Sequence, residues 1–231
     1  MLKPLPAIDA ADGAYRERTV ELGKTALLSV DMQNAEWTAE RQHAAKDPSS
    51  REAPERYFLD RVGDVLIPNQ QRLQAVARDA GIEVIYTTIE AYTLDGRDRS
   101  LDHKISNLFF PKGSWEAKVI DTVGPQPNDI VIPKTASGIF NCTNIEYVLR
   151  NLGIEYLIIY GVCTDQCVEG AIRDAADRGF LVTQVEDCCA TNEAVRHDVS
   201  VGQMKGHYCR TRSTDQIIAE VEALSAVRDG G

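Results

Sequence analysis

The sequence predicts an α/β fold of the three-layer, Rossmann-like kind: a mostly parallel sheet of six strands with helices on both faces. Three observations predict it. Short apolar runs with strand character alternate with amphipathic segments almost throughout the 231 residues. Such alternation is typical of right-handed βαβ units, which build a parallel sheet covered by helices. The composition does not shift along the chain, so we expect a single domain over residues 1–231.

The first part of the chain supplies three of the predicted strands. The apolar run that ends at Asp31 is typical of a strand buried on both faces, and Gly81 marks the end of the following helix. Pro68 either kinks that helix or marks its first turn. In chain order, the expected segments are a strand at 26–30, an irregular loop or flap at 35–58, a helix at 60–80, a strand at 82–90, a long polar connection at 91–115 and a strand at 129–134.

The second part of the chain supplies the other three strands. Glycines at 153 and 179 close two of its helices, and Thr164 and Thr214 stand where helix N-caps are expected. Small residues at 135–144 precede the first of these helices. In chain order, the expected segments are a helix at 145–153, a strand at 155–161, a helix at 164–179, a strand at 180–187, a helix at 188–206, a strand at 207–212 and a helix at 214–224.

Composition argues against some classes of binding partner. The net charge of −10 argues against nucleic acid or an anionic membrane as the main partner, and favours a small-molecule ligand. No apolar run reaches the roughly 18–20 residues of a membrane span, and the N-terminus lacks the apolar core of a signal peptide. We therefore expect a cytoplasmic protein with neither a nucleic-acid nor a membrane partner.

Six cysteines could form disulfides, but a chain without an export signal favours reduced thiols. A zinc site built from Cys163, Cys167 and the adjacent pair Cys188 and Cys189 is conceivable. Their spacing, however, is not that of paired CxxC zinc knuckles. We expect no metal and no cofactor.

Cys167 is the candidate nucleophile, because it falls in the first turn of a helix that starts at the carboxyl end of a strand. Free amides and the helix dipole favour a thiolate there, but the dipole contributes only about 0.3–1 kcal/mol, less than one pKa unit. A strongly activated Cys167 therefore needs a cation as well. The alternative interpretation is a buried, inert cysteine that only fills space.

Asp31 and Lys134 also stand at the carboxyl ends of predicted strands. In a parallel sheet these ends share one edge, where ligands of open α/β sheets bind. Asp31 is then a candidate base, and Lys134 a candidate cation that keeps Asp31 ionised and favours the thiolate. Each residue alone could equally cap a strand or anchor a loop.

Several separated motifs carry a family resemblance. They are DMQN at 31–34, PK at 133–134, GVCTDQCV at 161–168 and RDAADRG at 173–179. With these motifs the chain resembles the isochorismatase-like cysteine hydrolases over roughly residues 24 to 210.

The resemblance implies a Cys-Asp-Lys triad of Cys167, Asp31 and Lys134, and a homo-oligomer, often a dimer or a tetramer. It also implies a cis peptide between Cys163 and Thr164, which would aim the amides of Thr164 and Cys167 at a substrate oxygen as an oxyanion hole.

Members of the family that have the cysteine cleave C–N bonds of amides and ureides. The nicotinamidase branch typically uses an Asp-x-His metal pair after the first strand, and His43 has no aspartate two residues before it. Segments 112–115, 125–134 and 138–141 are closer to the ureidoacrylate, biuret and N-carbamoyl hydrolase branch. The alternatives are an amidase for maleamate- or nicotinamide-like amides, and a redox or non-catalytic thiol protein that uses Cys163 and Cys167.

Candidate substrate-binding residues follow from position near the expected edge. A charged group in the 91–115 connection (Arg97, Arg99, His103, Lys104) or near the last strand (His207, Arg210) could reach a substrate carboxylate. The residues expected to line the pocket are Gln33, Asn34, Glu90, Phe140, Asn141 and Tyr208.

Overall fold

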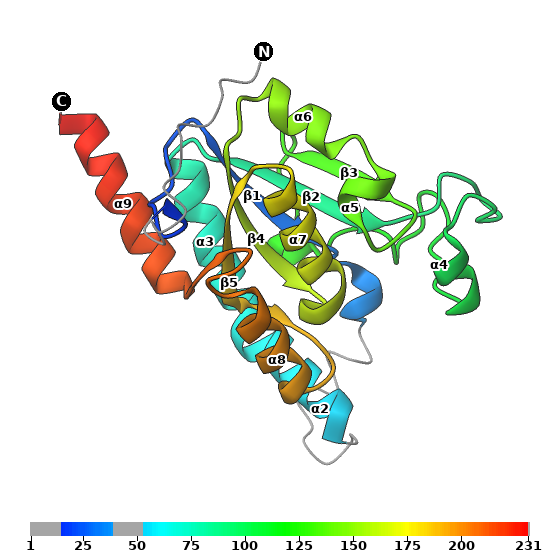
Figure 1. Ribbon diagram of the computed structural model, residues 1–231. Helices are drawn as coiled ribbons and strands as arrows, with labels where there is room; N and C mark the ends of the chain where they lie inside the picture. Colours follow the sequence, from blue (N-terminus) through cyan, green and yellow to red (C-terminus); the bar gives the residue numbers. More distant parts are fainter. Residues whose placement is uncertain (1–14, 39–52, 231) are drawn as a thin grey trace.

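A computed structural model describes residues 15–38 and 53–230 of the chain. Its centre is one sheet of six strands, all paired in parallel, in the order β3-β2-β1-β4-β5-β6 (Figure 1). The fold predicted from the sequence is therefore confirmed. In chain order, the strands are β1 (Thr25–Val30), β2 (Glu83–Ile89), β3 (Ile130–Lys134), β4 (Tyr156–Val162), β5 (Leu181–Ala190) and β6 (Arg210–Arg212).

Helices cover both faces of the sheet because the strands are apolar on both faces; β1 and β4 are buried along their whole length. On one face, Tyr86 and Tyr160 reach α3, where they contact Arg78 and Gln74. Figure 1 shows α5, α6 and α7 in front of the sheet. The helices are α2 (Ala53–Asp60), α3 (Ile67–Asp79), α4 (Leu101–Ile105), α5 (Ile139–Cys142), α6 (Ile145–Asn151), α7 (Glu169–Asp177), α8 (Ala194–Met204) and α9 (Thr214–Gly230), with short 3-10 turns η2 (Asn34–Glu36) and η5 (Asp121–Val123).

The expected helix at 60–80 is three consecutive segments in the structure. α2 begins at Ala53, inside the stretch expected to be irregular, and the wider π-helical segment η4 (Arg61–Leu66) joins it to α3. Pro68 is the second residue of α3, directly after η4, so it lies inside a continuous helical run at the point where the wider turn ends. The rest of the expected flap, residues 39–52, lies outside the described residues.

The expected helix at 188–206 starts too early. β5 continues through Cys188 and Cys189 to Ala190, because an irregularity in the register lets its end pair again with β4, at Gly161 and Val162. Both cysteine side chains are fully buried. α8 begins only at Ala194.

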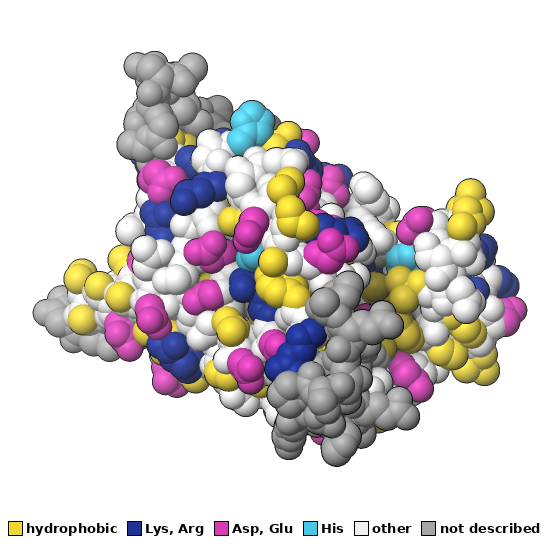
Figure 2. Space-filling view, turned by 90° about the horizontal axis from the view of Figure 1, so that it is seen from below, with side chains coloured by type: hydrophobic (Ala, Val, Ile, Leu, Met, Phe, Trp, Pro, Cys, Tyr) yellow, Lys and Arg dark blue, Asp and Glu magenta, His cyan; other side chains and the backbone are white. Residues whose placement is uncertain are grey.

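The long connection at 91–115 carries a short helix, α4, which begins after its N-cap Ser100 and projects from the body of the protein (Figure 1). Leu94, Leu101 and Ile105 in this arm are more than 70% exposed. Figure 2 shows apolar side chains gathered on this projecting part, and acidic and basic side chains interspersed over the rest of the face that it draws.

Candidate active site

The structure brings Asp31, Lys134 and Cys167 into direct contact at the carboxyl edge of the sheet. Asp31 directly follows β1, Lys134 ends β3, and Cys167 lies in the π-helical turn η6 (Thr164–Val168) after β4. Lys134 Nζ lies 2.9 Å from Asp31 Oδ2 and 3.4 Å from Cys167 Sγ. All three side chains are buried, Lys134 completely. The Lys134 side chain crosses β2 to reach Asp31, because β2 lies between β3 and β1 in the sheet.

The backbone around Asp31 aims its carboxylate. Asp31 has a positive φ of 55°, a conformation that aspartate adopts more readily than most residues. Its amide donates to the Thr87 carbonyl at 3.1 Å, and its Oδ1 accepts a hydrogen bond from Thr87 Oγ1 at 3.0 Å. Oδ2 instead pairs with the Lys134 ammonium at 2.9 Å, so the two carboxylate oxygens have different partners.

Gly161 lets β4 approach β1 closely beside Asp31. Its φ is +133°, and a Cβ built there would lie 2.1 Å from the Val30 carbonyl oxygen. Only glycine fits this position without moving the backbone of either strand. The close approach places η6, and with it Cys167, next to the end of β1.

Lys134 is held as a buried cation. Its Nζ donates to the carbonyl of Ala136 at 3.0 Å and lies 3.4 Å from that of Ser137, in addition to its contacts with Asp31 and Cys167. Burial lowers the pKa of Lys134, but the negative charge of Asp31 and the contact with Cys167 outweigh this effect and raise it above its ordinary value. The site therefore keeps a fixed positive charge over the whole physiological pH range.

Cys167 is a protonated thiol in this site. The pKa of the thiol is raised to about 12: burial is the largest cause, the charge of Asp31 acts in the same direction, and Lys134 only partly opposes both. Lys134 does favour the thiolate, as expected from the sequence, but burial and the charge of Asp31 outweigh its effect on the pKa of Cys167. The arrangement instead holds a thiol beside a carboxylate, with one lysine that contacts both.

The cis peptide bond lies one residue earlier than expected, between Val162 and Cys163 rather than between Cys163 and Thr164. The reason is that β4 pairs with β5 through Val162, so the chain leaves the sheet at the following bond. Thr164 is also not the N-cap; Cys163 takes that position, and its carbonyl accepts hydrogen bonds from the amides of Gln166 and Val168.

Gln33 and Asn34 lie beside Asp31, but their side chains hold the backbone. The Gln33 amide group bonds the amide and carbonyl of Ile89 and the carbonyl of Ala117. Asn34 Nδ2 donates to the Trp115 carbonyl. Both residues therefore fasten the segment after β1 to its neighbours, and Gln33 has no free polar group for a substrate.

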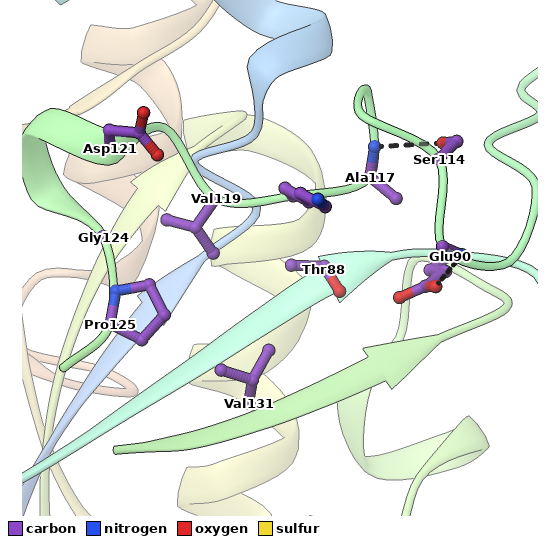
Figure 3. Close-up of a pocket in the computed structure, with 11 residues that line it drawn as sticks. Thr88, Glu90, Ser114, Ala117, Val119, Asp121, Gly124, Pro125 and Val131 are labelled. Atoms are coloured by element: carbon purple, nitrogen blue, oxygen red, sulfur yellow. Dashed lines mark hydrogen bonds between the residues drawn. The ribbon is translucent and has the colours of Figure 1, made fainter. Parts of the chain in front are cut away.

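Glu90 lines a cavity on the other side of the sheet. This cavity of about 510 Å³ lies between the end of β2, Val131 of β3 and residues 113–125 (Figure 3). Glu90 Oε1 accepts a hydrogen bond from the Gly113 amide. Thr88 points into the cavity, whereas its neighbour Thr87 points to Asp31, and successive residues of a strand face opposite sides. The cavity is therefore separated by the sheet from the three triad residues.

The other expected pocket residues are dispersed. Phe140 packs against Phe180, Asn141 is exposed, and Tyr208 lies under the guanidinium of Arg173. None of the contacts described for them involves the triad. The ring of His207 packs against the ring of Tyr208. Arg210 is buried and forms an ion pair with Glu220.

One residue of the 91–115 connection does approach the site. His103 is buried, its Nε2 lies 3.4 Å from Ser137 Oγ, and the charges of Lys134 and Asp31 both act on its pKa, which burial lowers. Arg97, Arg99 and Lys104 instead bond to groups of their own loop.

The sequence reasoning missed two residues next to the triad. Thr87, which bonds Asp31, looks like any strand residue. His197, whose Nδ1 lies 2.9 Å from Thr164 Oγ1, was hidden inside a segment assigned only as a helix. Neither residue stands out in the sequence, because β2 carries a second threonine, Thr88, and α8 carries several polar residues.

The described residues offer no helix long and apolar enough to cross a membrane. Within 15–38 and 53–230 there is also no group of three or more histidine, cysteine, aspartate or glutamate side chains that could hold a metal ion. All six cysteines stand as free thiols.

Comparisons with known proteins identify the family of the chain. The family model described as the isochorismatase domain matches residues 25–216. The chain is 32% identical over 192 residues to the ureidoacrylate amidohydrolase RutB of Rhizobium rhizogenes, covering 73% of this chain and 71% of the relative. RutB of Agrobacterium fabrum is also 32% identical, over 73% of this chain and 77% of the relative.

Solved structures share the fold. A cysteine hydrolase from Pseudomonas syringae superimposes with a TM-score of 0.75 at 20% identity, covering 90% of this chain and 96% of the other. An N-carbamoylsarcosine amidase from Thermoplasma acidophilum gives a TM-score of 0.63 at 24% identity, covering 83% and 97%.

Proposed function

Since the chain belongs to the isochorismatase family of hydrolases, we propose that it is a cysteine-dependent amidohydrolase that cleaves a C–N bond of a small ureide or carbamoyl compound. Ureidoacrylate is the first candidate substrate, because two relatives at 32% identity are ureidoacrylate amidohydrolases. Biuret, triuret and N-carbamoyl compounds follow. The observation that carries the proposal is the contact of one buried lysine with both a carboxylate and a thiol.

The first step transfers the thiol proton to Asp31 while the sulfur of Cys167 attacks the carbamoyl carbon. Releasing that proton to neutral water would cost about 7 kcal/mol for a thiol pKa of about 12. Transfer to Asp31 avoids most of this cost, because the proton stays in the site and the negative charge only moves between two atoms that Lys134 contacts. The lysine therefore stabilises the site before and after the transfer.

In the second step the tetrahedral intermediate expels ammonia or an amine, which leaves with the proton from Asp31. The negative oxygen of the intermediate is held by backbone amides of the η6 turn, that of Cys167 among them. Water then hydrolyses the thioester on Cys167, with Asp31 again as the base, and this restores the free thiol. The reaction consumes only substrate and water, so it needs no cofactor.

An ammonia-release screen tests the proposal. The compounds are ureidoacrylate, biuret, triuret, N-carbamoyl amino acids, maleamate and nicotinamide. We expect release from at least one ureide, and its loss in Cys167→Ala and Asp31→Asn, with a milder effect in the matched control Cys163→Ala. Unchanged turnover in Cys167→Ser would refute the role of Cys167 as nucleophile.

The screen also separates the alternatives. Release only from maleamate or nicotinamide would replace the ureide assignment with another amide. A redox thiol protein would release nothing, would depend on Cys163 as much as on Cys167, and would not need Asp31 or Lys134.

Assembly and location are part of the same proposal. We expect a cytoplasmic homo-oligomer, a dimer or a tetramer, on the basis of the family. Light scattering on the purified full-length chain measures the assembly, and a monomer at working concentration would contradict it.

A further inference from the structure

His197 of α8 lies between Arg61 and the turn that carries Cys167. Its Nε2 is 2.9 Å from an Arg61 nitrogen, and its Nδ1 is 2.9 Å from Thr164 Oγ1. The histidine is 4% exposed. Arg61 is itself anchored, because it also donates to the carbonyls of Cys189 and Glu186 on β5. A chain of contacts thus runs from the sheet to Thr164, the first residue of η6.

The chemistry of arginine fixes the tautomer of this histidine. A guanidinium has only N–H donors, so Nε2 of His197 must accept a hydrogen bond from Arg61. A neutral imidazole that accepts at Nε2 carries its hydrogen on Nδ1, and therefore donates to Thr164 Oγ1. Burial, and next the charge of Arg61, lower the pKa of His197 to about 4, while Asp198 and Asp165 oppose this effect. The histidine is neutral near neutral pH.

A second contact from α8 holds the same residue. The Ser200 hydroxyl lies 3.2 Å from the Thr164 carbonyl oxygen and 2.7 Å from Glu169 Oε2. His197 and Ser200 are three residues apart on α8 and so share one face of it. The single hydroxyl hydrogen of Ser200 serves two acceptors and its shorter contact is to Glu169, so the bond from His197 is the main contact that fixes Thr164 to α8.

We propose that His197 is a positioning residue for the proposed amide hydrolysis: with its tautomer fixed by Arg61, it holds Thr164 and thereby sets the geometry of the turn that carries Cys167. This inference rests on the proposed function for its kinetic consequence. Groups that are preorganised for a transition state lower the barrier more than they tighten substrate binding. Loss of the contact therefore lowers kcat and leaves KM nearly unchanged.

Two variants of similar shape distinguish the roles of the two ring nitrogens of His197. The amide nitrogen of His197→Asn takes the place of Nδ1 and keeps a donor towards Thr164, whereas the amide of His197→Gln takes the place of Nε2 and loses that donor. We expect kcat on the best ureide to fall about tenfold in His197→Gln, the loss of one hydrogen bond, and clearly less in His197→Asn. Equal effects of the two variants, or an effect on KM alone, would overturn the proposal.

A measurement that needs no substrate keeps this test apart from the proposed function. Nitrogen NMR of the full-length chain should show the hydrogen of His197 on Nδ1, and Arg61→Met should mix the two tautomers. The iodoacetamide reactivity of Cys167 should change in His197→Gln more than in His197→Asn. A hydrogen on Nε2 of His197 in the unaltered protein would refute the inference, even if the protein hydrolyses ureides. If no amide is hydrolysed, the proposed function fails. The tautomer of His197 and the reactivity of Cys167 still test the inference about His197.

Discussion

Replacing Asp31 by asparagine should abolish turnover and at the same time make the Cys167 thiol more acidic. The carboxylate has two opposing roles in this site: it is the proposed base for the thiol proton, and its negative charge raises the thiol pKa. The asparagine side chain would keep the size of the aspartate and the acceptor for Thr87, and would remove the charge. The ammonium of Lys134 retains the Ala136 carbonyl as an acceptor.

The size of the effect follows from the two distances to Lys134. Nζ lies 2.9 Å from Asp31 Oδ2 and 3.4 Å from Cys167 Sγ, so the oxygen and the sulfur are at most about 6.3 Å apart. At an effective dielectric constant of about 20, that upper limit on the separation corresponds to at least about 2.6 kcal/mol, or about two pKa units. The thiolate fraction at neutral pH would rise about a hundredfold. A more acidic thiolate is also a weaker nucleophile, which reduces the net gain to about tenfold.

The assay is the rate of iodoacetamide alkylation as a function of pH, with mass spectrometry to locate the label. Cys167→Ala in the same background corrects for the other thiols. We expect the alkylation profile of Asp31→Asn to move to lower pH while ammonia release is lost. A profile that stays in place or moves to higher pH would show that the carboxylate does not act on the thiol, and would remove Asp31 as its base.

Three further predictions concern the same edge of the sheet. Lys134→Met should move the alkylation profile in the opposite direction and destabilise the protein by about 3–5 kcal/mol in urea unfolding, because it leaves a buried carboxylate unpaired; unchanged stability would mean that the ion pair is not formed. Gly161→Ala should either prevent folding or cost several kcal/mol with a loss of activity, since its Cβ would meet the Val30 carbonyl, whereas Gly170→Ala, with open space around it, should be tolerated. The pKa of the buried Cys189 thiol is raised from 9.0 to about 12 by burial, so the unfolded chain loses its proton first as the pH rises. The protonated Cys189 thiol contributes fully to the free energy of unfolding below pH 9, and this contribution should decline by about 1.4 kcal/mol per pH unit between pH 9 and pH 12. The free energy of unfolding of Cys189→Ala should fall less over the same pH range.

The sheet and the meeting of Asp31, Lys134 and Cys167 could be predicted because both depend on local patterns. An apolar run that ends in a charged residue marks the end of a buried strand, and parallel topology then requires that Asp31 and Lys134 meet at one edge. The substrate-binding residues could not be found in this way. Phe140 lies six residues after β3 and Tyr208 two residues before β6, and whether either side chain enters a pocket or packs on a neighbour depends on helix packing that no local pattern encodes.

The pKa shift of the Cys167 thiol is another property that the sequence alone does not predict. Helix position and a nearby lysine both favour a thiolate, and the sequence reveals both. Burial acts in the opposite direction and is the largest effect on Cys167, yet it depends on how β4, η6 and the end of β1 close together around Gly161. In the proposed mechanism, a thiol that is protonated at rest gains its nucleophilicity when its proton moves to Asp31. The site therefore protects Cys167 from chance oxidation and alkylation at neutral pH, since both require the thiolate.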